Sequence, residues 1–100
     1  NHASAHGNIV AICDCDEGIM ADRAKNPKFE MAQRFTDYRK MFDEIGKSID
    51  AVTVSTPDHN HAPAAARALR MGKHTFCQKP LTHSIEEARV LATLARENKV

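Results

Sequence analysis

Two short apolar runs end in clusters of polar residues and prolines, and these clusters hold the side chains best suited to chemistry. The first run ends at Ser55-Thr56-Pro57-Asp58-His59-Asn60-His61, and the second ends at Gln78-Lys79-Pro80. A lysine beside a substrate alcohol can hydrogen-bond the oxygen and ease loss of its proton while the adjacent carbon gives up hydride. Lys79 is therefore a candidate catalytic residue. The alternative is a surface ion pair, which Pro80 argues against because an X–Pro bond restricts the residue before it.

An acidic residue, Asp14, comes directly after an earlier apolar run. A carboxylate in this place can accept both hydroxyls of a ribose, as in dinucleotide-binding domains. Asp16 is a second candidate for the same role. The ribose role is the favoured interpretation, and the alternative is that Asp14 is a turn residue or the cap of a helix over residues 16–25.

The segment Ser55-Thr56-Pro57 stands between a predicted strand and a predicted helix. Main-chain N–H groups at the start of a helix favour anionic or polar ligand groups. We therefore expect this segment to contact a ligand. Ordinary capping of the helix by Asp58 or Asn60 is expected there as well.

The histidines and cysteines near these segments could suggest zinc, through His59, His61, His74 and Cys77. They lack CxxC or HxxxH spacing, and the cysteines lie in apolar runs, so we predict no metal site.

The three cysteines, Cys13, Cys15 and Cys77, are an odd number, which argues against a disulfide framework. We expect reduced, buried thiols, with Cys13 and Cys15 on one face of a strand. Reduced thiols suit a cytoplasmic protein. Export of the full-length protein stays open, because the start of the natural chain is not seen.

The elements that must position these residues alternate between strand and helix. Strands are predicted over residues 8–13, 31–35, 51–55 and 74–77, the first and third as buried strands. Helices are predicted over 17–25, 38–45, 60–71 and 85–98. This alternation predicts an α/β fold with parallel strands and right-handed crossovers. Ligands bind at the carboxyl edge of such a sheet, where Asp14, Ser55 and Lys79 would lie.

Start and stop signals support these helices. Asp37 or Thr36 can cap the second helix and Gly46 can end it, while Gly72 is expected just past the third. Ser84 opens the fourth helix with a capping box. Its apolar stripe is predicted to be Ile85, Ala88, Leu91, Ala92 and Ala95.

Length and composition narrow the function classes. One hundred residues allow one domain at most, and a net charge of +1 gives no argument for nucleic acid or an anionic membrane. No run of 18 apolar residues is present, so no membrane span is predicted. A small molecule is the expected ligand.

Two segments of the chain resemble the Gfo/Idh/MocA oxidoreductases. They are Val54-Ser55-Thr56-Pro57-Asp58-His59-Asn60-His61-Ala62-Pro63 and Gly72-Lys73-His74-Thr75-Phe76-Cys77-Gln78-Lys79-Pro80-Leu81. The resemblance extends from Ile9 to Val100. It implies a Rossmann-like domain that binds NAD, with NADP not ruled out, and hydride transfer to or from a sugar or polyol. Cys15 and Asp16 offer no basic group for a 2′-phosphate, which favours NAD.

The resemblance also implies roles for individual residues. Lys79 matches the family's catalytic lysine and Asp14 its ribose-binding acid, while Thr56, Pro57 and His61 match the loop beside the nicotinamide. Ser55, Gln78 and Lys79, at the ends of their strands, complete the predicted cofactor contacts. The family's Glu-Lys-Pro motif reads Gln78-Lys79-Pro80 here, which removes a carboxylate beside the lysine. The sharp turn needed after a strand, and the resemblance, both favour a cis Lys79–Pro80 bond.

The family's first strand and glycine-rich phosphate loop would precede Asn8, and its C-terminal substrate domain would follow Val100. We therefore expect residues 1–100 to be part of a Rossmann domain, inactive alone, from a protein that forms homo-oligomers through the second domain. Residues 1–7 would be a lead-in or the remnant of a helix. The alternative is a non-catalytic Rossmann-like domain with a structural or interaction role, which the missing phosphate loop favours.

Overall fold

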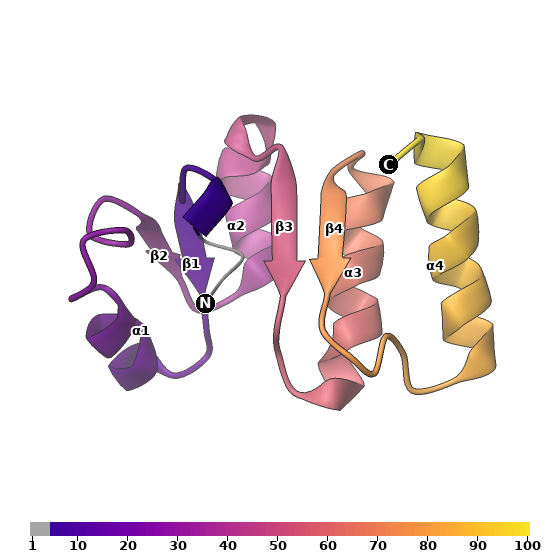
Figure 1. The fold of residues 1–100 in the computed structure, drawn as a ribbon, viewed down its shortest axis with the longest axis horizontal. Helices are drawn as coiled ribbons and strands as arrows, with labels where there is room; N and C mark the ends of the chain where they lie inside the picture. The colour runs from indigo at the N-terminus through magenta and orange to yellow at the C-terminus, as the bar shows by residue number, and fades with distance from the viewer. Residues whose placement is uncertain (1–4) are drawn as a thin grey trace. The chain divides into compact units, whose positions relative to one another are not determined.

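The computed structural model describes residues 5–100, so part of the predicted lead-in over residues 1–7 lies outside the described residues. Strands and helices alternate along the chain as predicted (Figure 1). The chain forms two compact units, the first ending at Ser48 and the second beginning at Ile49.

The first unit contains β1 (Ala11–Cys13), α1 (Glu17–Arg23), β2 (Gln33–Phe35) and α2 (Tyr38–Ile45), followed by a 3₁₀ turn over Gly46–Ser48. The strands β1 and β2 are parallel, with Ala11 opposite Gln33 and Cys13 opposite Phe35. Met41 and Phe42 are buried on α2, which packs on both strands. The predicted cap Asp37 accepts a hydrogen bond from the Arg39 main-chain N–H at 2.9 Å. The predicted amphipathic helix is therefore confirmed.

The second unit contains β3 (Ala51–Val54), the 3₁₀ turn η3 (Asp58–Asn60), α3 (His61–Arg70), β4 (His74–Cys77) and α4 (Ile85–Asn98). The strands β3 and β4 are parallel, and α3 packs on both of them and on α4. Small side chains let α3 approach closely: Ala62, Ala64, Ala65, Ala66 and Ala68 are all buried. Gly72 ends this segment at φ +70°, the left-handed conformation predicted for a residue just past a helix.

The burial expected for the strands was wrong. All of β1 is only half-buried, and Val54 is the sole buried residue of β3. Residues alternate along β3 and β4, so that Ala51, Thr53, His74 and Phe76 are exposed, Phe76 by 64%. The reason is that α3 covers one face of the β3–β4 sheet, while α2 packs on β1. A continuous apolar run in the sequence does not reveal how many faces are covered.

The fourth helix begins as predicted, and only part of its predicted apolar stripe is buried. Ser84 accepts from the Glu87 main-chain N–H at 3.2 Å, and the Glu87 carboxylate accepts from the Ser84 N–H at 3.0 Å, which completes the capping box. Of the predicted stripe, Leu91 is buried, but Ile85 is 76% exposed and Ala92 is also exposed. Ala88 and Ala95 of the stripe are half-buried, and Leu94 is half-buried beside them, on a helix that packs against α3.

Candidate functional site

The predicted residues after β3 and β4 lie at one edge of the second unit's sheet. Val54 and Cys77 are opposite each other, and the Gln78 main-chain N–H donates to the Val54 carbonyl at 2.9 Å, extending the ladder by one step. Because the strands are parallel, Ser55 and Gln78 leave the sheet at the same edge. The topology therefore brings together two of the three clusters that the sequence analysis identified.

His61 joins the two loops that follow these strands. Its Nε2 lies 2.7 Å from the Thr56 carbonyl oxygen and its Nδ1 lies 2.7 Å from the Pro80 carbonyl oxygen. The side chain is 1% exposed and is the largest fully buried one in the described chain. The structure therefore places His61 between the Thr56 and Pro80 loops as a buried connector.

Lys79 is exposed at this edge, next to the Pro80 turn. Within residues 5–100 its ammonium group makes no ion pair, so the surface-pair alternative finds no partner here. Its main-chain N–H donates to the Gln78 side-chain oxygen at 2.8 Å. The Lys79–Pro80 bond is cis, as predicted. An exposed amine beside a strand end can hydrogen-bond an oxygen of a bound molecule.

The helix start beside the first loop is built differently from the prediction. Neither Asp58 nor Asn60 caps α3 through its side chain. Instead, the Asn60 N–H donates to the Pro57 carbonyl at 2.9 Å, and the His61 N–H donates to the Asp58 carbonyl. The 3₁₀ turn over residues 58–60 takes up these amides, so no side-chain cap forms. The Thr56 hydroxyl lies 3.4 Å from the Pro57 carbonyl, a long contact that leaves it able to bind a ligand.

Asp14 and Asp16, the two candidates for binding the ribose, have different surroundings in the first unit. Asp16 is the cap of α1 and accepts from the Ile19 N–H at 3.0 Å. Asp14 follows β1 directly, is half-buried, and accepts from the Asp16 N–H at 2.9 Å through Oδ1. In the described chain its Oδ2 accepts no hydrogen bond. Asp14 is thus held in place with an oxygen open to a hydroxyl donor, whereas Asp16 is engaged in the helix.

The cysteines are free thiols, as predicted. Burial, and then the negative charge of Asp37, raise the pKa of Cys13 to about 11, and burial raises the pKa of Cys77. Both thiols therefore stay protonated at neutral pH and are poor nucleophiles. The expectation that Cys15 is buried was wrong: β1 ends at Cys13, and Cys15 is exposed in the turn that follows.

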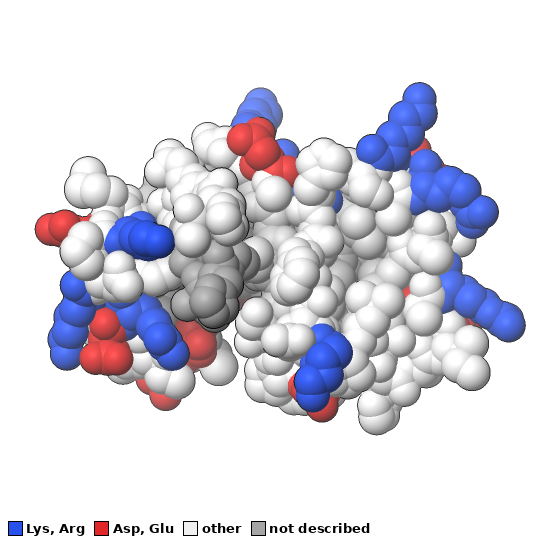
Figure 2. Space-filling model, in the orientation of Figure 1, with Lys and Arg blue, Asp and Glu red and all other residues white. Residues whose placement is uncertain are grey.

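The described chain has neither a metal-binding cluster nor a membrane-spanning helix. Within residues 5–100, no group of three or more histidine, cysteine or acidic side chains is arranged to hold a metal ion, and no helix is long and apolar enough to cross a membrane. Figure 2 shows acidic and basic side chains interspersed over α1 and uncharged atoms over the β3–β4 sheet.

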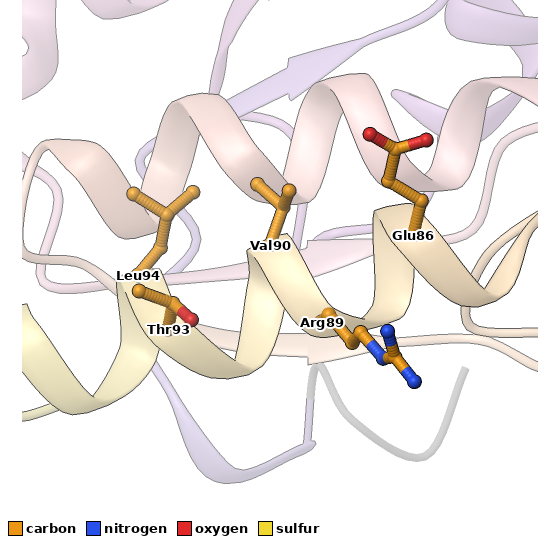
Figure 3. A pocket seen from close by; sticks show the side chains of 5 residues that line it. All are labelled: Glu86, Arg89, Val90, Thr93 and Leu94. Atoms are coloured by element: carbon orange, nitrogen blue, oxygen red, sulfur yellow. The ribbon is translucent and has the colours of Figure 1, made fainter.

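An open groove lies on α4 and is lined by residues of that helix alone: Glu86, Arg89, Val90, Thr93 and Leu94 (Figure 3). None of the side chains predicted for the site lines it. The predicted site residues therefore lie at the strand ends and not at this groove.

The contact between His61 and the Pro80 carbonyl was missed by the sequence analysis, which assigned His61 to a ligand-lining loop. The two residues are 19 positions apart. The available signal was a histidine at the start of an alanine-rich helix, where a polar ring has to be accommodated at the end of the helical core. Its partner is a main-chain carbonyl, which every residue has, so the residue types in the sequence do not indicate which carbonyl His61 contacts.

Comparisons with known proteins identify the family and the fold. A family described as "Oxidoreductase family, NAD-binding Rossmann fold", the Gfo/Idh/MocA family, matches residues 1–100. A levoglucosan dehydrogenase of Pseudarthrobacter phenanthrenivorans is 29% identical over 89% of this chain and 22% of its own length. Inositol 2-dehydrogenase 1 of Saccharopolyspora erythraea is 33% identical over 77% of this chain and 22% of its own length.

A solved structure also matches well. KijD10, a 3-ketoreductase from Actinomadura kijaniata in complex with TDP-benzene and NADP, superposes with a TM-score of 0.76 at 28% identity. The match covers 92% of this chain and 28% of KijD10. The chain therefore spans about a quarter of the length of the proteins it matches.

Proposed function

This chain belongs to the Gfo/Idh/MocA oxidoreductase family, which has an NAD-binding Rossmann fold, and from that premise we propose the activity of the full-length protein. It transfers a hydride between a nicotinamide cofactor and a hydroxyl-bearing carbon of a sugar or polyol. The observation that carries the proposal is the exposed Lys79 amine at the carboxyl edge of β3–β4, beside the Thr56 loop to which its turn is joined through His61. Relatives named as polyol and sugar dehydrogenases support the substrate class.

The residues present fit the cofactor's polar groups. Asp14, with one carboxylate oxygen held by a main-chain amide, would accept the ribose hydroxyls. Ser55, Thr56 and Pro57 would line the nicotinamide side, where the Thr56 hydroxyl is only weakly engaged. His61, Gln78 and Lys79 complete this set, His61 through the main chain that it fixes. When bound, the nicotinamide supplies the chemistry of accepting or giving a hydride.

Lys79 acts on the substrate oxygen. Its amino group hydrogen-bonds the reacting hydroxyl and takes part in moving that hydroxyl's proton in the same step. Gln78 stands where the family resemblance has a glutamate. Its side-chain oxygen accepts from the Lys79 main-chain N–H at 2.8 Å, so an amide can hold the lysine's backbone without a charge.

The remaining expectations concern the full-length protein. Residues 1–100 would form part of its cofactor domain, and a second domain would supply the substrate pocket and the contacts of a homo-oligomer. We keep a cytoplasmic location as part of the proposal, supported by the free thiols.

The test is cofactor binding and turnover in the full-length protein. Calorimetry with NAD⁺ and NADP⁺ separately should give tighter binding of NAD⁺, because Cys15 and Asp16 provide no cation for a 2′-phosphate. A panel of polyols and sugars should then yield reduced nicotinamide with at least one member. If neither dinucleotide binds, the chain belongs to a non-catalytic Rossmann-like protein and the proposal fails.

Asp14→Ala sharpens this test at one side chain. Losing charged-acceptor hydrogen bonds of roughly 1.5–3 kcal/mol should raise the Kd for NAD⁺ by about tenfold to a hundredfold. The matched control is Asp22→Ala, which removes an exposed carboxylate that pairs with Lys25 on the surface of the same unit. Equal affinities of the Asp14 and Asp22 variants would show that Asp14 does not hold the ribose.

A further inference from the structure

His61 makes two short polar contacts, and in each of them a ring nitrogen faces a hydrogen-bond acceptor. Both ring nitrogens lie 2.7 Å from a main-chain carbonyl oxygen, Nε2 from Thr56 and Nδ1 from Pro80. The ring is 1% exposed, so bulk water cannot replace either partner. Each nitrogen must therefore be satisfied by the carbonyl that it faces.

Carbonyl oxygens only accept hydrogen bonds. A neutral imidazole has one N–H donor and one bare nitrogen, so it can satisfy only one of the two carbonyls. The other nitrogen would then turn its lone pair toward an oxygen lone pair at 2.7 Å. An imidazolium carries a proton on both nitrogens and satisfies both contacts. The short distances also suit a charged donor, because charge-assisted hydrogen bonds are shorter than neutral ones.

We propose that His61 is held as a buried imidazolium that clamps the Thr56 loop to the Lys79–Pro80 turn. The histidine is a positioning residue: it acts through the main chain on both loops and fixes the turn that carries Lys79. One ring thus spans the two strand ends that no ladder hydrogen bond joins beyond Gln78 in the described chain.

The surroundings both oppose and support this charge. His61 is the first residue of α3, and the positive end of the helix dipole disfavours a cation there. The adjoining elements carry several titratable groups: Asp58 and His59 on η3, His74 and Cys77 on β4, and Glu86, Glu87, Arg89, Arg96 and Glu97 on α4, with Lys79 just after β4. Glu87 is engaged with the His83 and Ser84 amides, and burial keeps Cys77 protonated, so the two carbonyl oxygens are the groups that stabilise the proton on His61. Hydrogen bonds in a dry site are electrostatically stronger than in water, which favours the arrangement.

The direct test is the number of protons on the ring in the full-length protein. With histidine labelled by ¹⁵N at both ring positions, the His61 resonances should each show a one-bond coupling to a proton at neutral pH. His61→Gln identifies these signals, and His59→Gln, an exposed histidine two residues away, is the matched control that must leave them in place. A bare nitrogen on His61 would overturn the proposal. If His61→Gln does not fold, neutron diffraction from crystals of the unsubstituted protein decides the same question by showing one deuteron or two.

A kinetic arm, which rests on the proposed function, tests the positioning role. His61→Gln can reach one carbonyl but cannot donate from two ring positions, so kcat should fall at least tenfold while His59→Gln stays within twofold of the unsubstituted protein. The ring-proton measurement tests the clamp and the kinetic measurement tests the positioning role, so each can give a negative result without the other. Two ring protons without any hydride transfer would leave the clamp standing and remove the proposed function. An active enzyme whose His61→Gln variant keeps full kcat would overturn the positioning role.

Discussion

Lys79 is the residue on which the proposed chemistry depends most directly. It is exposed, has no ion-pair partner in the described chain, and has its backbone held by the Gln78 side chain and the His61–Pro80 contact. The main chain of Lys79 is held in place, while its amine is available to bind a ligand. That combination favours a reacting side chain over a surface charge.

Replacing Lys79 in the full-length protein should lower kcat by about 10²–10⁴, the usual contribution of a general acid–base group, while the Kd for NAD⁺ changes little. Lys79→Arg should recover little activity, because guanidinium does not give up its proton and has a different shape. Steady-state kinetics and calorimetry measure the two effects. Lys73→Ala, at the opposite end of β4, is the control and should behave like the unsubstituted protein. Near-normal turnover of Lys79→Ala would make Lys79 a structural residue.

Asp37 provides a pH-dependent contribution at the start of α2. A hydrogen bond from the Arg39 guanidinium, then one from its main-chain N–H, lower the pKa of Asp37 to about 2 from an ordinary 3.8. A depressed carboxyl pKa stabilises the fold above the ordinary value, and this contribution is lost as the pH falls from about 4 towards 2.

Asp37→Asn keeps a capping oxygen but removes the charge, so it isolates this effect. The urea midpoint of the variant should lie below that of the unsubstituted protein at pH 5, and the gap should close near pH 2. Arg39→Gln is the companion variant and should show the same convergence. A gap that stays constant with pH would mean that the Asp37 charge does not contribute.

At the scale of elements, the stability of α4 depends on the capping of its first turn, because the outer face of the helix is exposed. Only Leu91 is buried on this helix, and Ile85 and Val90 face outward. Few packed side chains hold the helix start, so the capping box at Ser84 and Glu87 should carry an appreciable share of its local stability.

Ser84→Ala should therefore destabilise α4 by about 1 kcal/mol, within the range of about 0.5–2 for loss of an N-cap. Ser84→Asp retains a capping oxygen and should stay close to the unsubstituted protein. Hydrogen exchange of the amides in the first turn of α4 is the measurement, since it reports local opening. If both variants exchange alike, the cap is not what holds this helix start.

At the scale of the whole molecule, the chain holds both predicted parts of a cofactor site in separate compact units, Asp14 in the first and the Thr56, His61 and Lys79 group in the second. Each two-stranded sheet is confined to its own unit. A two-stranded sheet is marginal by itself, and unpaired strand edges favour association with other chains.

The 100-residue chain should accordingly bind NAD⁺ much more weakly than the full-length protein. Its four glycines, at positions 7, 18, 46 and 72, do not form the closely spaced glycine-rich turn that cradles a pyrophosphate. Calorimetry should detect no saturation at concentrations that saturate the full-length protein. Equal affinities would reveal a phosphate site among residues 1–100 that the glycine pattern does not indicate.

Much of this protein follows from its sequence alone. The helix starts at Asp37 and Ser84, the left-handed Gly72, the alternation of parallel strands with helices, and the family were all predictable. The physical reason is that caps, turns and periodicity depend on interactions within three or four residues, which the local sequence specifies completely. The two polar segments at the strand ends were recognisable because parallel strands must end at one edge.

Tertiary structure decided the rest. Burial of the β3 and β4 faces depends on which helices pack there, so Phe76 is exposed although its run is apolar. Burial along α4 depends on how this helix packs on α3, and in the structure Ile85 and Ala92 are exposed. The role of His61 depends on two carbonyl oxygens, one of them 19 residues away. Main-chain acceptors are the same at every residue, so only packing selects which of them a buried ring will meet.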